Sequence, residues 1–349
     1  MEKPKTEGPP EFTPPADIVK MATAKPAVSA QADEGYYGVP LLKRPKWRWE
    51  IAFYFFLEGI SAGSFLLGAL ADLSGHKHWR KLALAAYEVS FLTLLPCPPL
   101  LIADLGRPER FHHMLRLFKP TSPMNLGAWT LTGFSAPVTA IAALRLIGDG
   151  SSKSQNKLVL RGGLGAVGLP FALTMISYPG VLLSTTSTPV WSRSRFLGAL
   201  FACSSIGNGA AATSLALSLQ NGNHSLALER LAKIENTARI CEGAALVTYL
   251  VTSKDAARPL TKGRHARPFW LGAIGCGLLL PVVLSVNRKP KKEHRRSRGK
   301  SIVRSVLALA AGLALKWTIT HAGRQSADDV QATRNATRPN KSAPGWGPG

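Results

Sequence analysis

The feature that most constrains the fold of this chain is a series of eight apolar stretches. Each is about 20 residues long, which is the length an α-helix needs to cross a ~30 Å hydrocarbon core. They cover residues 50–72, 82–103, 125–147, 160–183, 196–219, 231–252, 268–286 and 302–321. Because backbone polar groups find no water inside a bilayer, such spans form helices. The sequence therefore predicts an all-α integral membrane protein, a bundle of about eight transmembrane helices.

Two polar tails frame these spans. Residues 1–46 and 325–349 are rich in Pro, Ala, Lys and Ser or Asn and poor in aromatic residues. This composition is typical of disordered segments, which cannot bury enough apolar surface to fold. We therefore expect a disordered N-terminal tail (1–46), a transmembrane domain (47–324) and a disordered C-terminal tail (325–349).

The net charge of +23 raises the question of nucleic-acid binding. The Lys and Arg residues, however, lie in short loops and tails between apolar spans, and no nucleic-acid-binding signature is present. Anionic lipid headgroups explain this placement better. We expect membrane lipids as partners and no nucleic acid.

A long polar connector, Asp104 to Gly127 (DLGRPERFHHMLRLFKPTSPMNLG), separates the second and third spans. Just before it stands the sequence Pro-Cys-Pro-Pro at 96–99. Each proline removes a backbone donor, so the second helix must kink there. Carbonyl groups freed by a kink have to face protein or a cavity. We therefore expect a pocket beside this connector, at the working face of the protein.

Several ionisable residues fall inside the apolar spans. Glu58, Glu88 and Glu242 are costly there unless paired, protonated or facing a polar cavity, which makes them candidates for proton handling. For Glu58 the alternative is a neutral carboxyl bonded between helices. Arg239 and Glu242, three residues apart, can pair on one helical face, either as packing or within a proton path. Lys316 is expected to snorkel toward a membrane surface.

The sequence shows no grouped ligands for a redox metal. The four cysteines lie one apiece in four spans and are interpreted as small buried apolar residues. A membrane cytochrome would need histidines within its spans, whereas all eight histidines lie in loops or at span ends. We expect no haem, iron–sulfur cluster or other metal site in this chain.

Four segments, in order between about 47 and 324, resemble the NrfD/PsrC family. They are GISAGSFLLGAL, DLGRPERFHHMLRLFKPTSPMNLGAWTLTGF, YPGVLLSTTSTPVWSRSRFLGALFACSSIGNGAA and LKWTITHAG. The block from LGRPERF to SPMNLG is the most specific. The family comprises membrane subunits of polysulfide reductase, of cytochrome-linked nitrite reduction and of related molybdopterin complexes. The polar tails and the basic segment 287–300 depart from the family pattern.

The resemblance implies an activity that the composition does not. It implies a multi-pass protein of the cell (inner) membrane that binds quinone or menaquinone at the membrane edge and has no cofactor of its own. Electrons would pass to or from a ferredoxin-like iron–sulfur subunit, which connects to a catalytic, molybdopterin-containing subunit. For some relatives proton movement through the bundle has been proposed, so the resemblance leaves proton translocation open.

By position in the matching motifs, the resemblance also implies a quinone pocket. Asp104, Arg107 and His112 fall in the connector motif and Tyr178 in the YPGVLL motif, with His113 as a weaker candidate. In the expected mechanism His112 or Asp104 accepts a proton from the quinol headgroup, while Tyr178 and Arg107 orient it. A group that titrates near neutral pH suits this work, which favours histidine. Alternatively, Asp104 and Arg107 form a structural interfacial pair and His112 faces lipid headgroups.

Two other functions remain open from sequence. A secondary transporter or channel would be indicated by broken helices at matching positions in two halves of the chain. Prolines interrupt the second, third, fourth and seventh spans, but no convincing internal repeat accompanies them. A passive membrane anchor for a redox enzyme is the third interpretation.

Overall fold

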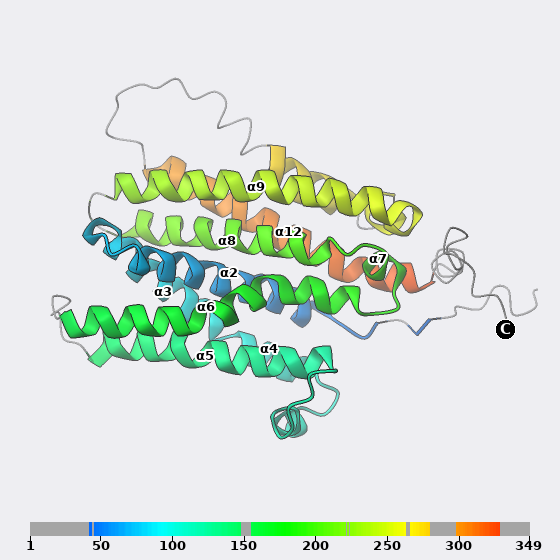
Figure 1. Ribbon diagram of the computed structural model, residues 1–349. Coiled ribbons are helices and arrows are strands. Elements are labelled where there is room, and N and C mark those ends of the chain that lie inside the picture. The colour runs from blue at the N-terminus through cyan, green and yellow to red at the C-terminus, as the bar shows by residue number, and fades with distance from the viewer. Residues whose placement is uncertain are drawn as a thin grey trace, which may run out of the picture. The chain divides into compact units, whose positions relative to one another are not determined.

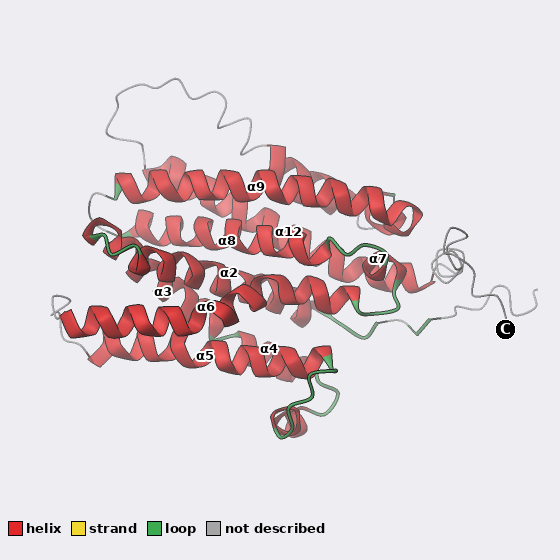
Figure 2. Cartoon of the chain, in the orientation of Figure 1, coloured by secondary structure: helices red, strands yellow, loops and turns green. Residues whose placement is uncertain are grey.

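The computed structural model describes residues 42–43, 45–147, 155–220, 222, 224–262, 266–279 and 298–328. In these ranges the secondary structure is helical, with no strand (Figure 2). The longer helices are α2 (Trp49–Leu73), α3 (Arg80–Leu94), α4 (Cys97–Asp104), α5 (Pro123–Ile147), α6 (Gln155–Ser184), α8 (Leu197–Leu219), α9 (Ser225–Ser253), the π-helix η5 (Pro268–Leu279) and α12 (Arg298–Asp328). Short helical turns are η2 (Lys77–Trp79), η3 (Pro108–Leu115), α7 (Pro189–Ser192), η4 (Lys254–Ala257) and α10 (Arg258–Thr261).

Six helical segments of the described chain are long and apolar enough to cross a membrane, which confirms the all-α membrane class. They are Trp49–Leu73, Lys77–Asp104, Pro123–Leu146, Leu158–Ser184, Leu197–Leu219 and Ser301–Asp328. They match the first five predicted spans and the eighth. Helix α9 covers the sixth predicted span but buries charged side chains, and η5 covers only the start of the seventh. The count of eight crossings stays a prediction.

The predicted tails lie for most of their length outside the described residues. Helix α12 runs to Asp328, four residues past the predicted end of the transmembrane domain at 324. Ser326 and Ala327, in that extension, are buried. The disorder predicted for the two tails stays a prediction.

Helix α2 is the central element of the bundle (Figure 1). Helices α3, α6, α8 and α12 all pack against it. Of the most apolar 18-residue stretch of α2, 89% is buried, whereas the corresponding figure for α5 is 39%. The crossing with α8 is close, because a Cβ added at Gly63 or at Gly209 would collide with the backbone of the opposite helix. The Ser64 hydroxyl donates to the Gly209 carbonyl across this crossing (3.3 Å). Glycine at 63 and 209 therefore lets the two helices approach closely.

The second span is broken at its proline cluster, as predicted. Helix α3 ends at Leu94 and α4 begins at Cys97. Pro98 and Pro99 occupy the first turn of α4, where backbone N–H groups have no helical partner to lose. Helices α5 and α6, in contrast, continue through the prolines within them.

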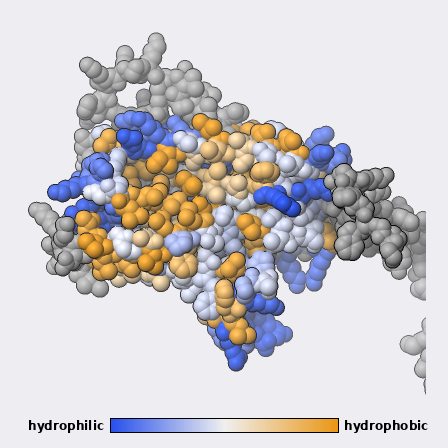
Figure 3. Space-filling view, in the orientation of Figure 1, coloured by the Kyte–Doolittle hydropathy of each residue, from blue (hydrophilic) through white to orange (hydrophobic). Residues whose placement is uncertain are grey.

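The connector joins α4 to α5 at one end of the bundle and projects from it (Figure 1). Asn125 organises it: its Nδ2 donates to the carbonyls of Met114 (2.6 Å) and Leu117 (3.0 Å), and its Oδ1 accepts from the backbone N–H of Lys119 (2.6 Å). Figure 3 shows apolar side chains over the flank of the bundle, hydrophilic ones toward its ends, and both kinds on this connector. That distribution fits a bundle lying across a bilayer.

Candidate functional site

The connector histidines lie on the surface. Arg107, His112 and His113 are all exposed, and the rings of His112 and His113 are tilted with centroids 4.5 Å apart. Phe111, next to them in η3, is 44% exposed. These residues form a mixed cationic and aromatic surface on a lobe at the end of the bundle.

Asp104, the last residue of α4, is half-buried. Its electrostatic neighbours are Arg48 and Glu50 at the start of α2, and Arg324 near the end of α12. The guanidinium of Arg324 also donates to the Trp47 carbonyl (2.6 Å). The charged neighbours of Asp104 therefore lie at the end of the bundle. Among the described residues it does not pair with Arg107, contrary to what the structural alternative expected.

Tyr178 connects two of the sequence motifs. Its side chain is buried in α6 and its hydroxyl donates to the carbonyl of Pro123, the first residue of α5 (2.9 Å). A Cβ added at Gly127 would overlap the Tyr178 ring, so only glycine fits there. The YPGVLL segment and the SPMNLG segment, far apart in sequence, thus meet at the base of the connector. In the described residues no hydrogen bond joins Tyr178 to Arg107, His112 or His113.

Glu58 lies inside the bundle, fully buried on α2. Neither carboxyl oxygen has a partner in strict hydrogen-bonding geometry within the part of the chain that the structure describes, although the Tyr54 hydroxyl lies close enough to interact with it. Its electrostatic neighbours include the Lys316 ammonium and the hydroxyls of Tyr54 and Tyr178. Because the Tyr178 hydroxyl also bonds to Pro123 at the base of the connector, Glu58 lies within electrostatic reach of that base.

Lys316 corrects a prediction. Its ammonium does not snorkel but is fully buried, donating to the Phe55 carbonyl (3.0 Å) and to the Ser205 hydroxyl (3.0 Å). It also lies 5.1 Å from the centroid of the Phe201 ring. The prediction was wrong because α12 turns this side chain toward α2 and α8 instead of along the helix to a surface.

The charged series continues in α9. The predicted pair is confirmed: Arg239 donates to Glu242 at 2.6 Å, with both side chains buried. Arg239 also donates to the Asn208 side chain (2.7 Å) and to the Ala308 carbonyl (3.1 Å). Both Arg239 and Glu242 are electrostatic neighbours of Lys316.

Beyond that pair, Arg304 of α12 forms an ion pair with buried Glu235 (3.0 Å) and donates to Asn236 (3.0 Å). One turn away the Ser301 hydroxyl lies 3.1 Å from that of Ser218 and 3.4 Å from that of Ser214. We call this set, on α2, α8, α9 and α12, the polar seam: Glu58, Ser205, Asn208, Ser214, Ser218, Glu235, Arg239, Glu242, Ser301, Arg304 and Lys316.

The polar seam is balanced in formal charge, with three carboxylates (Glu58, Glu235, Glu242) and three cations (Arg239, Arg304, Lys316). Isolated charges inside a bilayer are strongly unfavourable, and pairing offsets that cost. The seam begins at Glu58, about 14 Å along α2 from its start, and reaches the far end of α8 at Ser218. It thus provides a compensated polar track through an apolar bundle.

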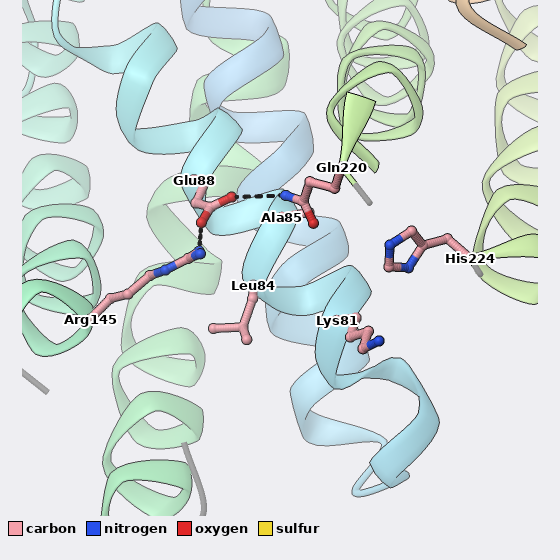
Figure 4. A pocket seen from close by; sticks show the side chains of 7 residues that line it. All are labelled: Lys81, Leu84, Ala85, Glu88, Arg145, Gln220 and His224. Atoms are coloured by element: carbon pink, nitrogen blue, oxygen red, sulfur yellow. Dashed lines mark hydrogen bonds and ion pairs between the residues drawn. The ribbon is translucent and has the colours of Figure 1, made fainter. Parts of the chain in front are cut away.

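Glu88 lies apart from the other candidates. It precedes the break between α3 and α4, whereas Asp104 is the last residue of α4. Its carboxylate is 30% exposed, pairs with Arg145 of α5 and accepts from the Gln220 side chain (3.4 Å). Figure 4 shows it at the edge of a cavity of about 160 Å³ that Lys81, Leu84, Ala85 and His224 complete. The structure therefore does not bring Glu88 to the connector.

Sequence reasoning missed several buried polar contacts. Asp72 and Arg161 form a two-pronged ion pair (2.6 Å for each bond) between the ends of α2 and α6. The pair of Arg304 with Glu235 was not predicted either. The sequence does place opposite charges at similar depths in different spans. Which of them pair, however, depends on how the helices are arranged, and the sequence alone does not give that arrangement.

No group of three or more His, Cys, Asp or Glu side chains arranged to hold a metal ion occurs among the described residues. Cys276 and the histidines at 265 and 294 lie outside the side chains described. The expectation that this chain has no metal site or haem stays a prediction. Cys97 is buried, whereas Cys241 is exposed and so departs from the expected burial.

Comparison with known proteins gives consistent matches. A model of the family described as polysulphide reductase, NrfD, matches residues 41–327. The chain is 29% identical over 301 residues to one chain of the polysulfide reductase of Wolinella succinogenes, covering 80% of this chain and 94% of that one. It is 26% identical over 311 residues to protein NrfD of Escherichia coli, covering 80% and 95%. A shorter similarity, 34% over 89 residues, links it to one subunit of the selenate reductase of Mesobacillus selenatarsenatis and covers 26% and 21%.

Proposed function

Because the chain belongs to the polysulfide reductase NrfD family of multi-pass membrane proteins, we propose that it exchanges electrons between the membrane quinone pool and an iron–sulfur partner subunit. Two of the similar proteins are each named as one component of a larger reductase, which indicates work within a multisubunit complex. The partners we propose are a ferredoxin-like iron–sulfur subunit and a catalytic molybdopterin subunit. Reduction of the terminal substrate would then take place outside this chain.

The observation that carries this proposal is the meeting of two motifs at the Tyr178–Pro123 hydrogen bond. An amphipathic quinone needs hydrogen-bonding groups for its ring oxygens and apolar surface for its tail. The base of the connector supplies both, with the Tyr178 hydroxyl, half-buried Asp104 and the apolar ends of α4, α5 and α6. The residues present therefore fit a quinone headgroup.

Quinol oxidation releases two electrons and two protons, so the site needs a proton acceptor as well as an electron acceptor. We assign the acceptor role to His112 or Asp104 and the orienting role to Tyr178 and Arg107, with His113 as the alternative base. The electrons leave to the docked iron–sulfur protein. The reverse direction, quinone reduction, uses the same groups.

The polar seam suggests where protons go. Glu58 is an electrostatic neighbour of Tyr178, and Lys316, Arg239 and Glu242 follow it across the bundle. We propose that Glu58 and Glu242 relay protons along this track during quinol turnover. Glu88, at the far end, would exchange protons with the water there.

Substitutions at the base of the connector test the site. We expect His112→Gln or Asp104→Asn to lower quinol turnover by about 10²-fold or more, as loss of a general base does. Tyr178→Phe should lower it about 5- to 10-fold by removing one hydrogen bond of roughly 1 kcal/mol. Turnover is measured on the intact complex with a short-chain quinol.

The matched control for Tyr178→Phe is Tyr249→Phe. Tyr249 is buried too and donates its hydroxyl to a backbone carbonyl, that of Val190 (2.6 Å), which belongs to α7 and not to the connector. It should leave turnover unchanged. If His112→Gln and Asp104→Asn both turn over quinol normally, neither residue belongs to the site.

A further inference from the structure

We infer that the cavity beside Glu88 is a binding site for the headgroup of an anionic phospholipid. Its lining comes from Lys81, Leu84, Ala85 and Glu88 of α3, Arg145 of α5, and Gln220 and His224 between α8 and α9. In Figure 4 the His224 ring and Lys81 lie on the opposite side of the space from Arg145. This inference is independent of the proposed exchange of electrons with quinone.

The charge and the donors of the cavity match a phosphate. Lys81 and Arg145 outnumber the one carboxylate, Glu88, whose charge Arg145 already compensates. Gln220 holds the other oxygen of Glu88. His224 lines the space as well, but its Nε2 atom is shielded from solvent, so its ring has to turn before it can donate to a ligand. Cations facing one space are groups that bind phosphate oxygens.

The depth of the cavity fits a headgroup layer. It lies where α3 and α9 begin and where α5 and α8 end. Lys81 is the second residue of α3, and Glu88 lies about 12 Å along the helix from its start. Since the headgroup layer adds roughly 5–8 Å to each side of the hydrocarbon core, the cavity spans the boundary between the two.

The surface beside the cavity is apolar enough to hold an acyl chain. This feature favours a lipid over a free anion as the ligand. Lys81, Leu84 and Glu88 occupy one face of α3, and residues four and seven positions beyond Glu88 continue that face. These are Leu92, 64% exposed, and Leu95, 54% exposed. A phosphate held by Lys81 would therefore have Leu84 next to it and the apolar surface at Leu92 about 16 Å further along the same face for its tails.

The test measures bound lipid on the full-length protein purified with its partners in mild detergent. Native mass spectrometry follows retention of phosphatidylglycerol against phosphatidylcholine, and a second arm adds inorganic phosphate alone. We expect phosphatidylglycerol to be retained, and Lys81→Gln to weaken it about fivefold, as loss of one interfacial cation does. The control Lys233→Gln removes an equal charge from an exposed pair with Glu229, outside the cavity, and should change nothing.

A second pair of variants separates lipid from free phosphate. Leu92→Gln should also weaken phosphatidylglycerol retention, whereas Leu173→Gln, at a 53% exposed leucine of α6, should not. If the protein retains no lipid but binds inorganic phosphate, and Leu92→Gln leaves that binding unchanged, the ligand is a free anion and the lipid assignment is wrong. Equal retention of both lipids, or a bound quinone lost with Lys81→Gln, would overturn the proposal as a whole.

Discussion

The Lys316 ammonium and the Glu58 carboxyl are the two groups on which the polar seam depends most at its connector end. Both are fully buried, yet the hydrogen bonds of Lys316 go to Phe55 and Ser205 rather than to Glu58. An arrangement in which neither group is locked to the other leaves the carboxyl available for proton exchange. Without the Lys316 ammonium a charged Glu58 would be uncompensated inside the bundle, which is costly enough for the carboxyl to take up a proton instead.

The substitution Lys316→Met tests this role directly. Without its countercharge Glu58 should be neutral and should relay fewer protons, so proton movement per electron should fall at least twofold in proteoliposomes. Lys233→Met, which removes an exposed lysine worth at most about 1 kcal/mol, serves as the control. Unchanged proton movement in Lys316→Met would exclude Lys316 and the Glu58 end of the seam from the path.

At the same scale, sequence predicts contacts within a helix far better than contacts between helices. The pairing of Arg239 with Glu242 was predictable because residues three positions apart on one helix always face the same side. The direction of Lys316 was not, since it depends on how α12 is rotated against α2 and α8. The same holds for Glu88, whose partner Arg145 comes from another helix.

At the scale of elements, the α2–α8 crossing controls the position of Glu58 and Ser205. We predict that Gly63→Ala is strongly destabilising, by about 2 kcal/mol or more, because the added methyl group meets the Ser205 backbone and one of two central helices must shift. Thermal unfolding in detergent measures the loss.

Gly162→Ala is the matched control for this substitution. Gly162 also lies in a membrane helix, but a Cβ there would meet nothing within 4 Å. Alanine should be neutral or stabilising by up to about 1 kcal/mol, the usual gain of helix propensity over glycine. Similar losses in the two variants would show that helix propensity, and not the crossing, governs stability at these sites.

Element boundaries were predictable where the cause is local. The break between α3 and α4 follows from prolines in the second span, whose effect needs no knowledge of the fold. The ordering of the connector around Asn125 was not predictable, because its bonds to Met114 and Leu117 form only once the loop closes.

For the whole molecule, length and hydropathy were enough to identify the membrane class, since both are read along the chain. Residues 231–252 of α9 were predicted as a span, but the helix is not among the six that are apolar enough to cross a membrane, because Glu235, Arg239 and Glu242 lower its hydropathy. Those charges become acceptable only through partners on α8 and α12. The candidate site divides in the same way: its connector motifs were visible in sequence, whereas the polar seam exists only in the assembled bundle.

Electron exchange between quinone and an iron–sulfur partner is tested most directly by EPR. The spectrum is recorded on the protein purified in mild detergent with its partners, before and after addition of a reduced menaquinol analogue. We predict iron–sulfur signals that appear on quinol addition, are lost when the partner is stripped, and are much weaker with Asp104→Asn or with His112→Gln. A purified chain with no iron–sulfur partner, or clusters that quinol does not reduce in any variant or in the native protein, would contradict this function.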